Sequence, residues 1–544
     1  MHSQNLQEYV DFLRRALPEE DRIALPDAAL ERVARHALTV REATPWGRSI
    51  PEWIFRDYVL FPRVNDEFPE AWHAPIWESL RARLAGLSMT EAALEVNVWC
   101  AEHATYQSTD NRTAGPLTVL RRGCGRCGEE STLLTAALRA AGIPARQMYS
   151  PRWAHCDDNH AWVEAWLDGG WHYMGACEPE PEPDSGWFTA AASKAMLVHT
   201  RAFGEAPEGE RVEREYGNFS IVNRTAAYAR TRRVTVRVAD GGRPLPGAAV
   251  RFELANMAEL YPISEKITDA RGENEALREE AAGRGDEQNA PASRMASRER
   301  CTARSESEAL RFADEKLCAD VGSEALQKRG AAARENGDAA EDVLPPTERF
   351  VQRPPRETRI QPTVHSEAAA RRHAETLRRC ERMRAARSAE LASDDADLAR
   401  ARGNAGEIRA FVSDARFAQA DKRALLSTLR EKDLADTSAE TLTDALETAL
   451  PVKTALPEAI WREAVLCPRI ADEKLLPVRR ALRQALGEGL CPSDEAARVD
   501  GESTAEIPAA REYAETAEAA ALPGGADKAS RCMGAAKTGE NPAS

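Results

Sequence analysis

Hydrophobic residues recur at helical spacing through the first part of the chain. The stretches LQEYVDFLRRAL and PDAALERVARHAL place Leu, Val and Ala three to four positions apart, which is the period of one buried helix face. An aromatic-rich stretch, IPEWIFRDYVLFPRVNDEF, follows and is expected to pack against the segment after it. Residues 1–88 are therefore predicted to form a helical N-terminal lead.

The period changes to two within residues 231–254. Val234, Val236 and Val238 alternate with polar residues, the turn ADGG follows, and AAVRFEL resumes the hydrophobic run. Alternation on both sides of a glycine-rich turn predicts a β-hairpin. We expect this hairpin to belong to a small β-sandwich-like module over residues 206–271.

The later part of the chain has a different composition. Residues 272–345 are rich in Glu, Ala, Arg, Ser and Gly and nearly lack aromatic residues. Such a segment buries too little apolar surface to offset chain entropy, so we expect it to be disordered. Helical patterning returns over residues 346–499, for example in KRALLSTLREKDLAD, and residues 500–544 are predicted to be a disordered tail.

Composition and charge narrow the class of protein. The chain has 544 residues, of which 43% are hydrophobic, and a formal net charge of −15, which argues against nucleic-acid or anionic-membrane binding. Its eleven cysteines, an odd number unevenly spread, are not typical of a disulfide framework. The first twenty residues lack the features of a signal peptide, and no apolar run reaches the roughly 18–20 residues of a membrane span. We therefore expect a cytoplasmic protein.

The candidate chemistry begins in RRGCGRCGEESTLLTAALRAAGIPAR, residues 121–146. Apolar residues at helical spacing follow Cys127 until Gly142, and Pro144 then prevents the helix from continuing. Cys127 is thus placed at a helix N-terminus. Unpaired N–H groups and the helix dipole favour a thiolate there, which is the nucleophilic form of cysteine.

A nucleophilic cysteine needs a base and a group that orients the base. Downstream, His160 begins the alternating run HAWVEAWL, the turn DGG follows, and WHYMGAC returns. An antiparallel hairpin of this length brings His160 close to Cys177 and Glu178 at the end of the second strand. The predicted order is a cysteine at a helix start, a histidine at a strand start and an acid near the end of the next strand.

Together these pieces resemble the transglutaminase-like superfamily, the papain-like acyl-transfer fold shared by transglutaminases, peptide N-glycanases and many bacterial relatives. The matching sequence segments are GCGRCGEES, LRAAGIPARQ, NHAWVEAW and GGWHYMGACEP. They fall within residues 90–205, about a fifth of the chain. The resemblance implies an α+β fold with a papain-like, transglutaminase-like catalytic core over residues 89–205. In that core a nucleophile helix packs on an antiparallel sheet, and a small β-sandwich-like module and helical flanking regions surround it.

The resemblance also implies roles for individual residues. Cys127 takes the family's nucleophile position and His160 the position of the general base. The family's aspartate usually lies four residues after the tryptophan of the returning strand, where this chain has Gly175. The nearest acid is Glu178, three residues further along, which is the candidate third member of the triad.

Other assignments remain open. Asp157 and Asp158, just before the histidine, are further candidates for the acid, and His155 and His172 compete for the role of base. The spacing of the CxxC motif is also compatible with a redox pair or with half of a zinc site. A second CxxC is missing, so a zinc ion bound by Cys124 and Cys127 would need its further ligands from His155, Cys156 and Cys177.

The expected reaction is attack of Cys127 on an amide carbonyl of a protein or peptide, giving a thioester that water or an amine resolves. His160 would move the protons. Backbone N–H groups near the cysteine, with Trp99 or Gln107 as candidate side-chain donors, are expected to stabilise the oxyanion. Hydrolysis, as by a peptidase, amidase or deamidase, is favoured over transamidation because it needs no second substrate site.

No cofactor and no metal are implied by this reading. A second class of function stays open because Gly175 stands where the family has its acid. In that alternative the chain is a catalytically inactive transglutaminase-like scaffold for protein–protein interaction.

Overall fold

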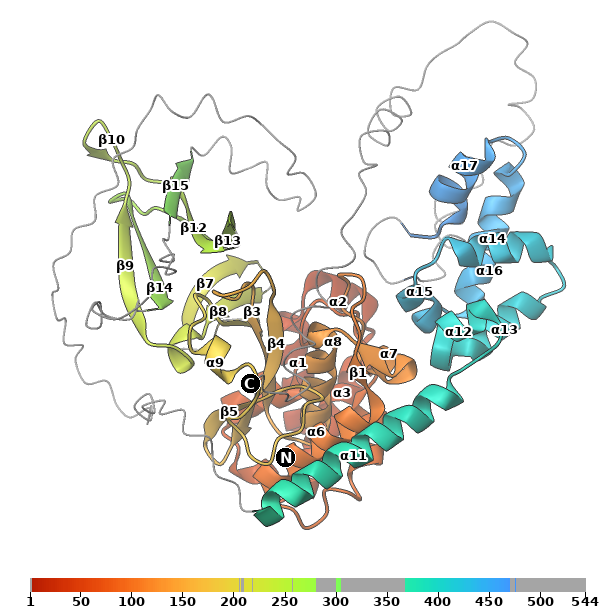
Figure 1. Cartoon of the computed structure of the whole chain (residues 1–544), viewed down its shortest axis with the longest axis horizontal. Helices are drawn as coiled ribbons and strands as arrows, with labels where there is room; N and C mark the ends of the chain where they lie inside the picture. Colours follow the sequence, from red (N-terminus) through yellow and green to blue (C-terminus); the bar gives the residue numbers. More distant parts are fainter. Residues whose placement is uncertain are drawn as a thin grey trace, which may run out of the picture. The chain divides into compact units, whose positions relative to one another are not determined.

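The computed structural model describes residues 2–279, except 205, 207–209, 218 and 257, together with residues 300–304, 367–469 and 475. The chain divides into two compact units, residues 1–392 and residues 393–544. Figure 1 shows the helices and strands of both units. The candidate chemistry lies in the first unit.

The N-terminal segment is helical and shares one hydrophobic core with the segment that carries Cys127. Leu13, Ala34 and Leu80 of the lead are fully buried in the same cluster as Leu133 and Leu134. The lead is therefore part of the first unit's main core and does not form a separate domain. Its helices are α1 (His2–Ala16), α2 (Glu19–Ala24), α3 (Asp27–Ala43), α4 (Glu52–Phe55) and α5 (His73–Leu80), with irregular helical turns at Gly47–Ser49 and Arg56–Leu60.

A buried helix, α8 (Cys127–Ala140), forms the centre of the first unit. Every residue from Gly128 to Ala140 is buried, because α8 packs on strands β3 and β4 on one side and on α5, α6 and α7 on the other. The flanking helices are α6 (Met89–His103) and α7 (Pro116–Arg122). The predicted α+β fold is confirmed, with the helix that begins at Cys127 packed on an antiparallel sheet.

The sheet has six strands in the order β5-β4-β3-β6-β8-β7, and all neighbours are antiparallel. The predicted hairpin after His160 is present, with Leu167 opposite Gly170 at its turn. β7 and β8 complete this sheet, although the sequence places them in the β-module. The strands are β3 (Ala145–Ser150), β4 (His160–Leu167), β5 (Gly170–Met174), β6 (His199–Phe203), β7 (Arg211–Tyr216) and β8 (Phe219–Asn223).

The predicted hairpin within residues 231–254 is wrong, although its strands exist. β9 (Thr231–Arg237) pairs with β14 (Glu273–Glu279), and β12 (Ala249–Asn256) pairs with β13 (Glu259–Ile267) and β15 (Arg300–Arg304). The ADGG turn closes only a two-residue hairpin between β10 (Ala239–Asp240) and β11 (Arg243–Pro244). Alternation shows that a strand has one buried face, but it does not specify the strand's partner.

Strands β14 and β15 fall inside the segment predicted to be disordered. Their backbones pair with β9 and β12, so these two stretches are ordered strands. The remainder of residues 280–345 and all of residues 500–544 lie outside the described residues. The small β-module has its own core, which includes Val250, Phe252, Leu254 and, from the segment before β6, Met196.

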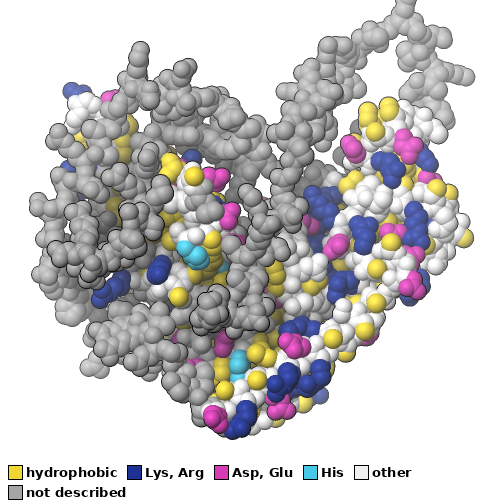
Figure 2. All heavy atoms as spheres, in the orientation of Figure 1, with side chains coloured by type: hydrophobic (Ala, Val, Ile, Leu, Met, Phe, Trp, Pro, Cys, Tyr) yellow, Lys and Arg dark blue, Asp and Glu magenta, His cyan; other side chains and the backbone are white. Residues whose placement is uncertain are grey.

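Helix α11 (Glu367–Glu390) follows the β-module in the chain but packs on α6. Cys380 is buried in the main core, and the guanidinium of Arg379 donates to Glu102 at 2.7 Å. In Figure 2 the outer face of α11 carries side chains of both charges. The arginine-rich stretch that begins at Arg371 therefore forms a helix with one buried face and one solvated face.

The second unit is helical in the part that the structure describes, up to residue 475. Its core contains Leu425, Leu426, Leu446 and Trp461. Its helices are α12 (Ala396–Ala401), α13 (Ala405–Ser413), α14 (Gln419–Ser427), α15 (Glu431–Asp436), α16 (Ala439–Ala449) and α17 (Glu458–Ile460). Among the described helices of the whole chain, none has the length and apolar character needed to cross a membrane.

Candidate active site

Cys127 is the first residue of α8, as the sequence predicts. The chain reaches it through β2 (Cys124–Gly125), which pairs in parallel with β1 (Thr105–Tyr106). Arg126 then has an extended backbone and acts as the N-cap residue, so the chain turns into the helix directly at the cysteine. The thiol therefore lies at the helix end where backbone N–H groups are unpaired.

The Glu129 side chain holds the N-terminus of α8 in place. Its carboxylate is fully buried and accepts hydrogen bonds from the backbone N–H of Arg126 at 2.9 Å and of Ala114 at 3.0 Å. The Thr109 hydroxyl also donates to it, at 3.0 Å. One carboxylate thus ties the loop before α7 to the residue before Cys127, which makes the surroundings of the thiol rigid.

The thiol meets the start of β4. The backbone N–H of Ala161 donates a hydrogen bond to the sulfur of Cys127. Since Ala161 is bonded directly to His160, this contact brings the sulfur beside the backbone of the candidate base. Nε2 of His160 has no hydrogen-bond partner among the described residues, so the pairing of the two side chains, expected from the order of helix and hairpin, stays a prediction.

His160 lies in a pocket of aromatic rings. Its own ring is 4.7 Å from that of Trp187 and 5.0 Å from that of Phe188, with Trp162 at 5.9 Å and Trp153 at 6.2 Å. The side chain is 7% exposed, and its Nε2 has no hydrogen-bond partner within the described part of the chain. Burial lowers the pKa of His160 to about 3, so the imidazole is neutral near pH 7.

Burial also raises the pKa of the Cys127 thiol to about 11. The Ala161 hydrogen bond and Arg126 oppose this shift, while the carboxylates of Glu130 and Asp158 add to it. The pKa of the thiol is thus shifted upward, whereas a helix N-terminus alone would lower it. Removal of the sulfur from water outweighs the N–H groups, so the thiol is neutral near pH 7.

Glu178 does not hydrogen-bond to His160. Its carboxylate accepts from the indole N–H of Trp187 at 2.8 Å, and the Trp187 ring lies against His160. A Cβ added to Gly175 would lie 2.6 Å from the same carboxylate oxygen, Oε2. The Glu178 carboxylate therefore occupies the space where a side chain at position 175 would begin, and it reaches the histidine only through the indole.

Asn97 of α6 holds the chain between positions 175 and 178, and sequence reasoning missed it. Its side-chain amide donates to the carbonyls of Gly175 at 2.8 Å and Glu178 at 3.4 Å, and its oxygen accepts from the N–H of Cys177 at 3.0 Å. Cys177 has a positive φ of 57°, which is unusual for a residue with a side chain. The amide thus sets the turn that carries Glu178.

The competing bases lie elsewhere. His172 is on β5 opposite Ala165, about 16 Å along β4 from His160 at ~3.3 Å per residue. It pairs with Asp184, with Nδ1 2.8 Å from Oδ2. His155 is exposed in the loop between β3 and β4. Neither histidine replaces His160 as the histidine at the start of β4.

The alternative acids, Asp157 and Asp158, are both exposed in that same β3–β4 loop. Asp158 is close enough to Cys127 to raise the pKa of the thiol. Asp157 accepts a hydrogen bond through its backbone carbonyl from Arg152 at 2.9 Å. Asp158 therefore contributes negative charge to the rim of the site.

The two candidate oxyanion donors differ in position. Trp99 is 4% exposed and belongs to the main core, with its ring 4.6 Å from that of His103. Gln107 has an exposed side chain, and its backbone N–H donates to Gly125 at 2.8 Å, two residues before the cysteine. The assignment of either side chain to the oxyanion stays a prediction.

Two tyrosines near the thiol were not found from the sequence. Burial raises the pKa of Tyr106 and of Tyr149, and in both cases the charge of Cys127 adds to the shift. Tyr106 is opposite Gly125 in the β1–β2 pair, and Tyr149 is opposite Ala161 in the β3–β4 pair. Only the strand pairing, which the sequence does not reveal, brings them to the site.

The β-module holds the loop that flanks the site. Asn256 at the end of β12 donates through its side-chain amide to the carbonyl of Trp153 and, at 2.8 Å, to that of Cys156. The guanidinium of Arg152 lies over the ring of Tyr261, on β13, at 4.7 Å. The module thus fixes one wall of the site from outside the core.

The zinc alternative gains no support from this geometry. Across residues 2–279 and the other described segments, no group of three or more His, Cys, Asp or Glu side chains is placed to hold a metal ion. Cys124 is 2% exposed and Cys177 is 7% exposed, and neither forms a disulfide in the described part of the chain.

Comparison with known proteins supports the resemblance found in the sequence. Residues 79–176 match the model of the transglutaminase-like superfamily, and this segment includes both Cys127 and His160. The chain is also similar to a solved structure from Cytophaga hutchinsonii described as a "putative cysteine protease", at 17% identity and a TM-score of 0.21. That similarity covers 33% of this chain and 66% of the other. Among the curated proteins, no match is found.

Cys127 and His160 thus lie in a segment that matches the transglutaminase-like superfamily, which is a superfamily of thiol enzymes. Glu178 falls two residues beyond the end of the matched segment.

Proposed function

We propose that this protein is a cysteine-dependent enzyme that acts on amide or peptide bonds through a thioester at Cys127. The observation that supports the proposal is the hydrogen bond that the backbone N–H of Ala161 donates to the sulfur, because it puts the residue next to His160 at the helix start that carries Cys127. The match of this segment to a thiol-enzyme superfamily supports the same class.

In the proposed reaction the sulfur attacks the amide carbon while its proton passes to His160. The two transfers are coupled, because burial opposes a thiolate and an imidazolium when each forms alone. The tetrahedral oxyanion collapses, the C–N bond breaks, and His160 returns the proton to the leaving amine. Water then attacks the thioester and gives its proton to His160, and the acid leaves as the thiol re-forms.

Glu178 has a positioning role in this proposal. Its hydrogen bond with Trp187 holds the indole against His160, and the indole restricts the imidazole. Hydrolysis remains the favoured outcome over transamidation. The substrate is proposed to be a protein or peptide, and the site requires no cofactor.

The test is acylation by p-nitrophenyl acetate followed by peptide mapping with mass spectrometry. We expect one acetyl group on Cys127, formed more slowly by several orders of magnitude in His160→Ala and absent in Cys127→Ala. Cys156→Ala is the matched control, because Cys156 is also a partly buried thiol beside the site. If Cys127 acylates no faster than Cys156, or if His160→Ala changes nothing, the enzyme proposal fails.

A second function, that of an inactive scaffold, is favoured by two observations. Nε2 of His160 has no partner in the described part of the chain, and the thiol has a pKa of about 11. A scaffold predicts that all partly buried thiols of the first unit acylate equally slowly. It also predicts that Cys127→Ala leaves folding and partner binding unchanged.

A further inference from the structure

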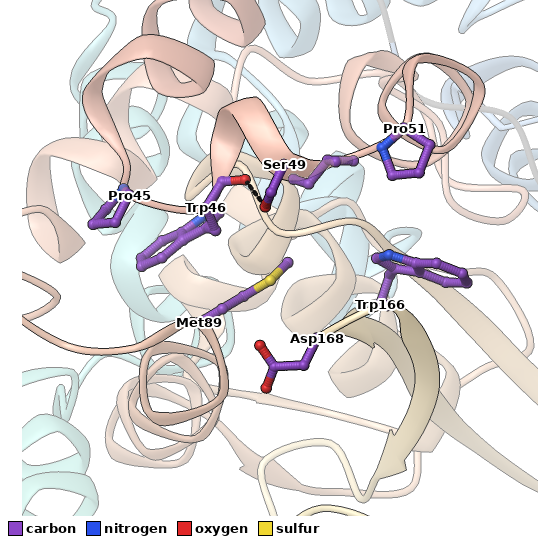
Figure 3. Close-up of a pocket in the computed structure, with 9 residues that line it drawn as sticks. Pro45, Trp46, Ser49, Pro51, Met89, Trp166 and Asp168 are labelled. Atoms are coloured by element: carbon purple, nitrogen blue, oxygen red, sulfur yellow. Dashed lines mark hydrogen bonds between the residues drawn. The ribbon is translucent and has the colours of Figure 1, made fainter.

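A pocket of about 500 Å³ lies at the end of β4 opposite to His160. Figure 3 shows its walls, which come from the segment after α3, from the start of α6 and from the β4–β5 turn. Its volume is within the range of roughly 300–1,000 Å³ that is usual for small-molecule sites. The lining residues are Pro45, Trp46, Ser49, Ile50, Pro51, Met89, Trp166, Asp168 and Gly169.

The apolar walls are anchored. The indole N–H of Trp46 donates to the carbonyl of Ala141 at 3.2 Å, and the Ser49 hydroxyl donates to the carbonyl of Trp46 at 2.8 Å. Trp166 packs edge-on against Trp171, with ring centroids 5.5 Å apart. Two indoles and Met89 therefore line a cavity whose shape is set by the fold and does not depend on a ligand.

One acid, Asp168, lies at the edge of this pocket with its side chain exposed. Asp168 occupies the β4–β5 turn with a φ of 50°, and the Thr90 hydroxyl donates to its Oδ2 at 2.9 Å. No arginine or lysine pairs with Asp168 in the described part of the chain, and none of the nine lining residues is basic. In Figure 3 its carboxylate lies between Met89 and Trp166, at the edge of the cavity.

We propose that this pocket binds an organic cation, an alkylammonium or guanidinium group on an apolar body such as an arginine side chain. The Asp168 carboxylate would pair with the charge, and the faces of Trp46 and Trp166 would attract it through cation–π contact. An anion would be repelled by Asp168. A neutral ligand would gain no attraction from the Asp168 carboxylate, which is exposed to water.

The pocket is separate from the proposed active site. Trp166 is six residues beyond His160 on β4, or about 20 Å at ~3.3 Å per residue. A cation bound there does not touch Cys127. The inference therefore goes beyond the proposed function and stands even if Cys127 is not a nucleophile.

The experiment is calorimetric titration of the full chain with N-acetyl-arginine amide, and with the citrulline analogue as its neutral isostere. We expect measurable binding of the arginine compound that weakens with salt, and roughly tenfold weaker binding of the citrulline compound. Saturation-transfer NMR with tetramethylammonium tests the cation without hydrogen bonding.

The key variant is Asp168→Asn. Asparagine tolerates the positive φ and can still accept from Thr90, so only the charge is removed. We expect a loss of roughly tenfold or more in affinity for the arginine compound, and no loss in Asp240→Asn, which neutralises an acid of the β10–β11 hairpin. The proposal is overturned if the arginine compound does not bind at millimolar concentration, if citrulline binds equally well, or if Asp168→Asn binds as the unchanged protein does.

Discussion

Asn97 holds the turn that follows β5, and its removal should destabilise the first unit. Its amide makes three hydrogen bonds to the backbone of Gly175, Cys177 and Glu178, and the side chain is 1% exposed. A buried hydrogen bond contributes about 1 kcal/mol net, and its loss costs more when a buried carbonyl is left unpaired. We therefore expect Asn97→Ala to lower the free energy of unfolding of the first unit by about 3 kcal/mol.

The assay is urea unfolding followed by tryptophan fluorescence. All eleven tryptophans except Trp461 precede residue 393, so the signal reports on the first unit. Hydrogen exchange of the Cys177 amide gives a local readout, because Asn97 is its acceptor. The exchange of this amide should accelerate even under conditions in which the unit stays folded.

The matched control is Asn404→Ala. Asn404 also donates to two carbonyls, those of Leu434 at 2.8 Å and Thr437 at 2.7 Å, but it belongs to the second unit. Its removal should leave the fluorescence transition of the first unit unchanged. A loss below about 1 kcal/mol in Asn97→Ala, or an equal loss in Asn404→Ala, would refute the assignment of these bonds as the support of the turn.

Three further predictions concern charge and space around the site. His160 has a folded pKa of about 3, below its unfolded value of about 6.5, so stability is full above pH 6.5 and is lost as the pH falls toward 3. About 2 kcal/mol of the loss between pH 7.5 and 5 should therefore disappear in His160→Gln, as measured by urea unfolding at both pH values. Gly175→Asp should lower the melting temperature, because its Cβ would meet the carboxylate of Glu178, and adding Glu178→Ala should restore part of it. Glu164→Ala should cost about 3 kcal/mol in urea unfolding, because it leaves the buried guanidinium of Arg146 without its closest carboxylate, at 2.8 Å.

The sequence predicts the local parts of this site well. Helix α8 is marked by apolar spacing from Cys127, by Gly142 after its end and by Pro144 beyond it, and the structure has the helix there. The β4–β5 hairpin is marked by alternation and a glycine turn, and it forms with Leu167 opposite Gly170 at its turn. These signals are short-range, so a single segment contains them.

The contacts of Glu178 were not predictable in the same way. Its distance from His160 depends on the turn at Cys177, and that turn depends on Asn97 from a helix about eighty residues earlier. Likewise the partner of β9 is β14 rather than β12, because the alternation of a strand is compatible with any neighbour.

The direction of the pKa shift of the Cys127 thiol could not be predicted from the sequence either. A helix N-terminus can be read from the sequence and favours a thiolate, but the burial of the sulfur comes from the packing of α8 against β4. The sequence identifies the position of Cys127 along the helix. It does not identify how much water reaches the sulfur, which here decides the direction of the shift.

The packing of α11 on α6 has a consequence for how the first unit folds during its synthesis. Ribosomal synthesis releases the N-terminal part first, so α6 emerges long before α11, whose Arg384 donates to the carbonyl of Ala101 at 2.9 Å. Until Glu390 has left the ribosome, the nascent first unit exposes the face of α6 that Cys380 later buries. A chaperone that recognises newly made apolar surface would find it there, and a fragment ending before Glu367 would expose it permanently.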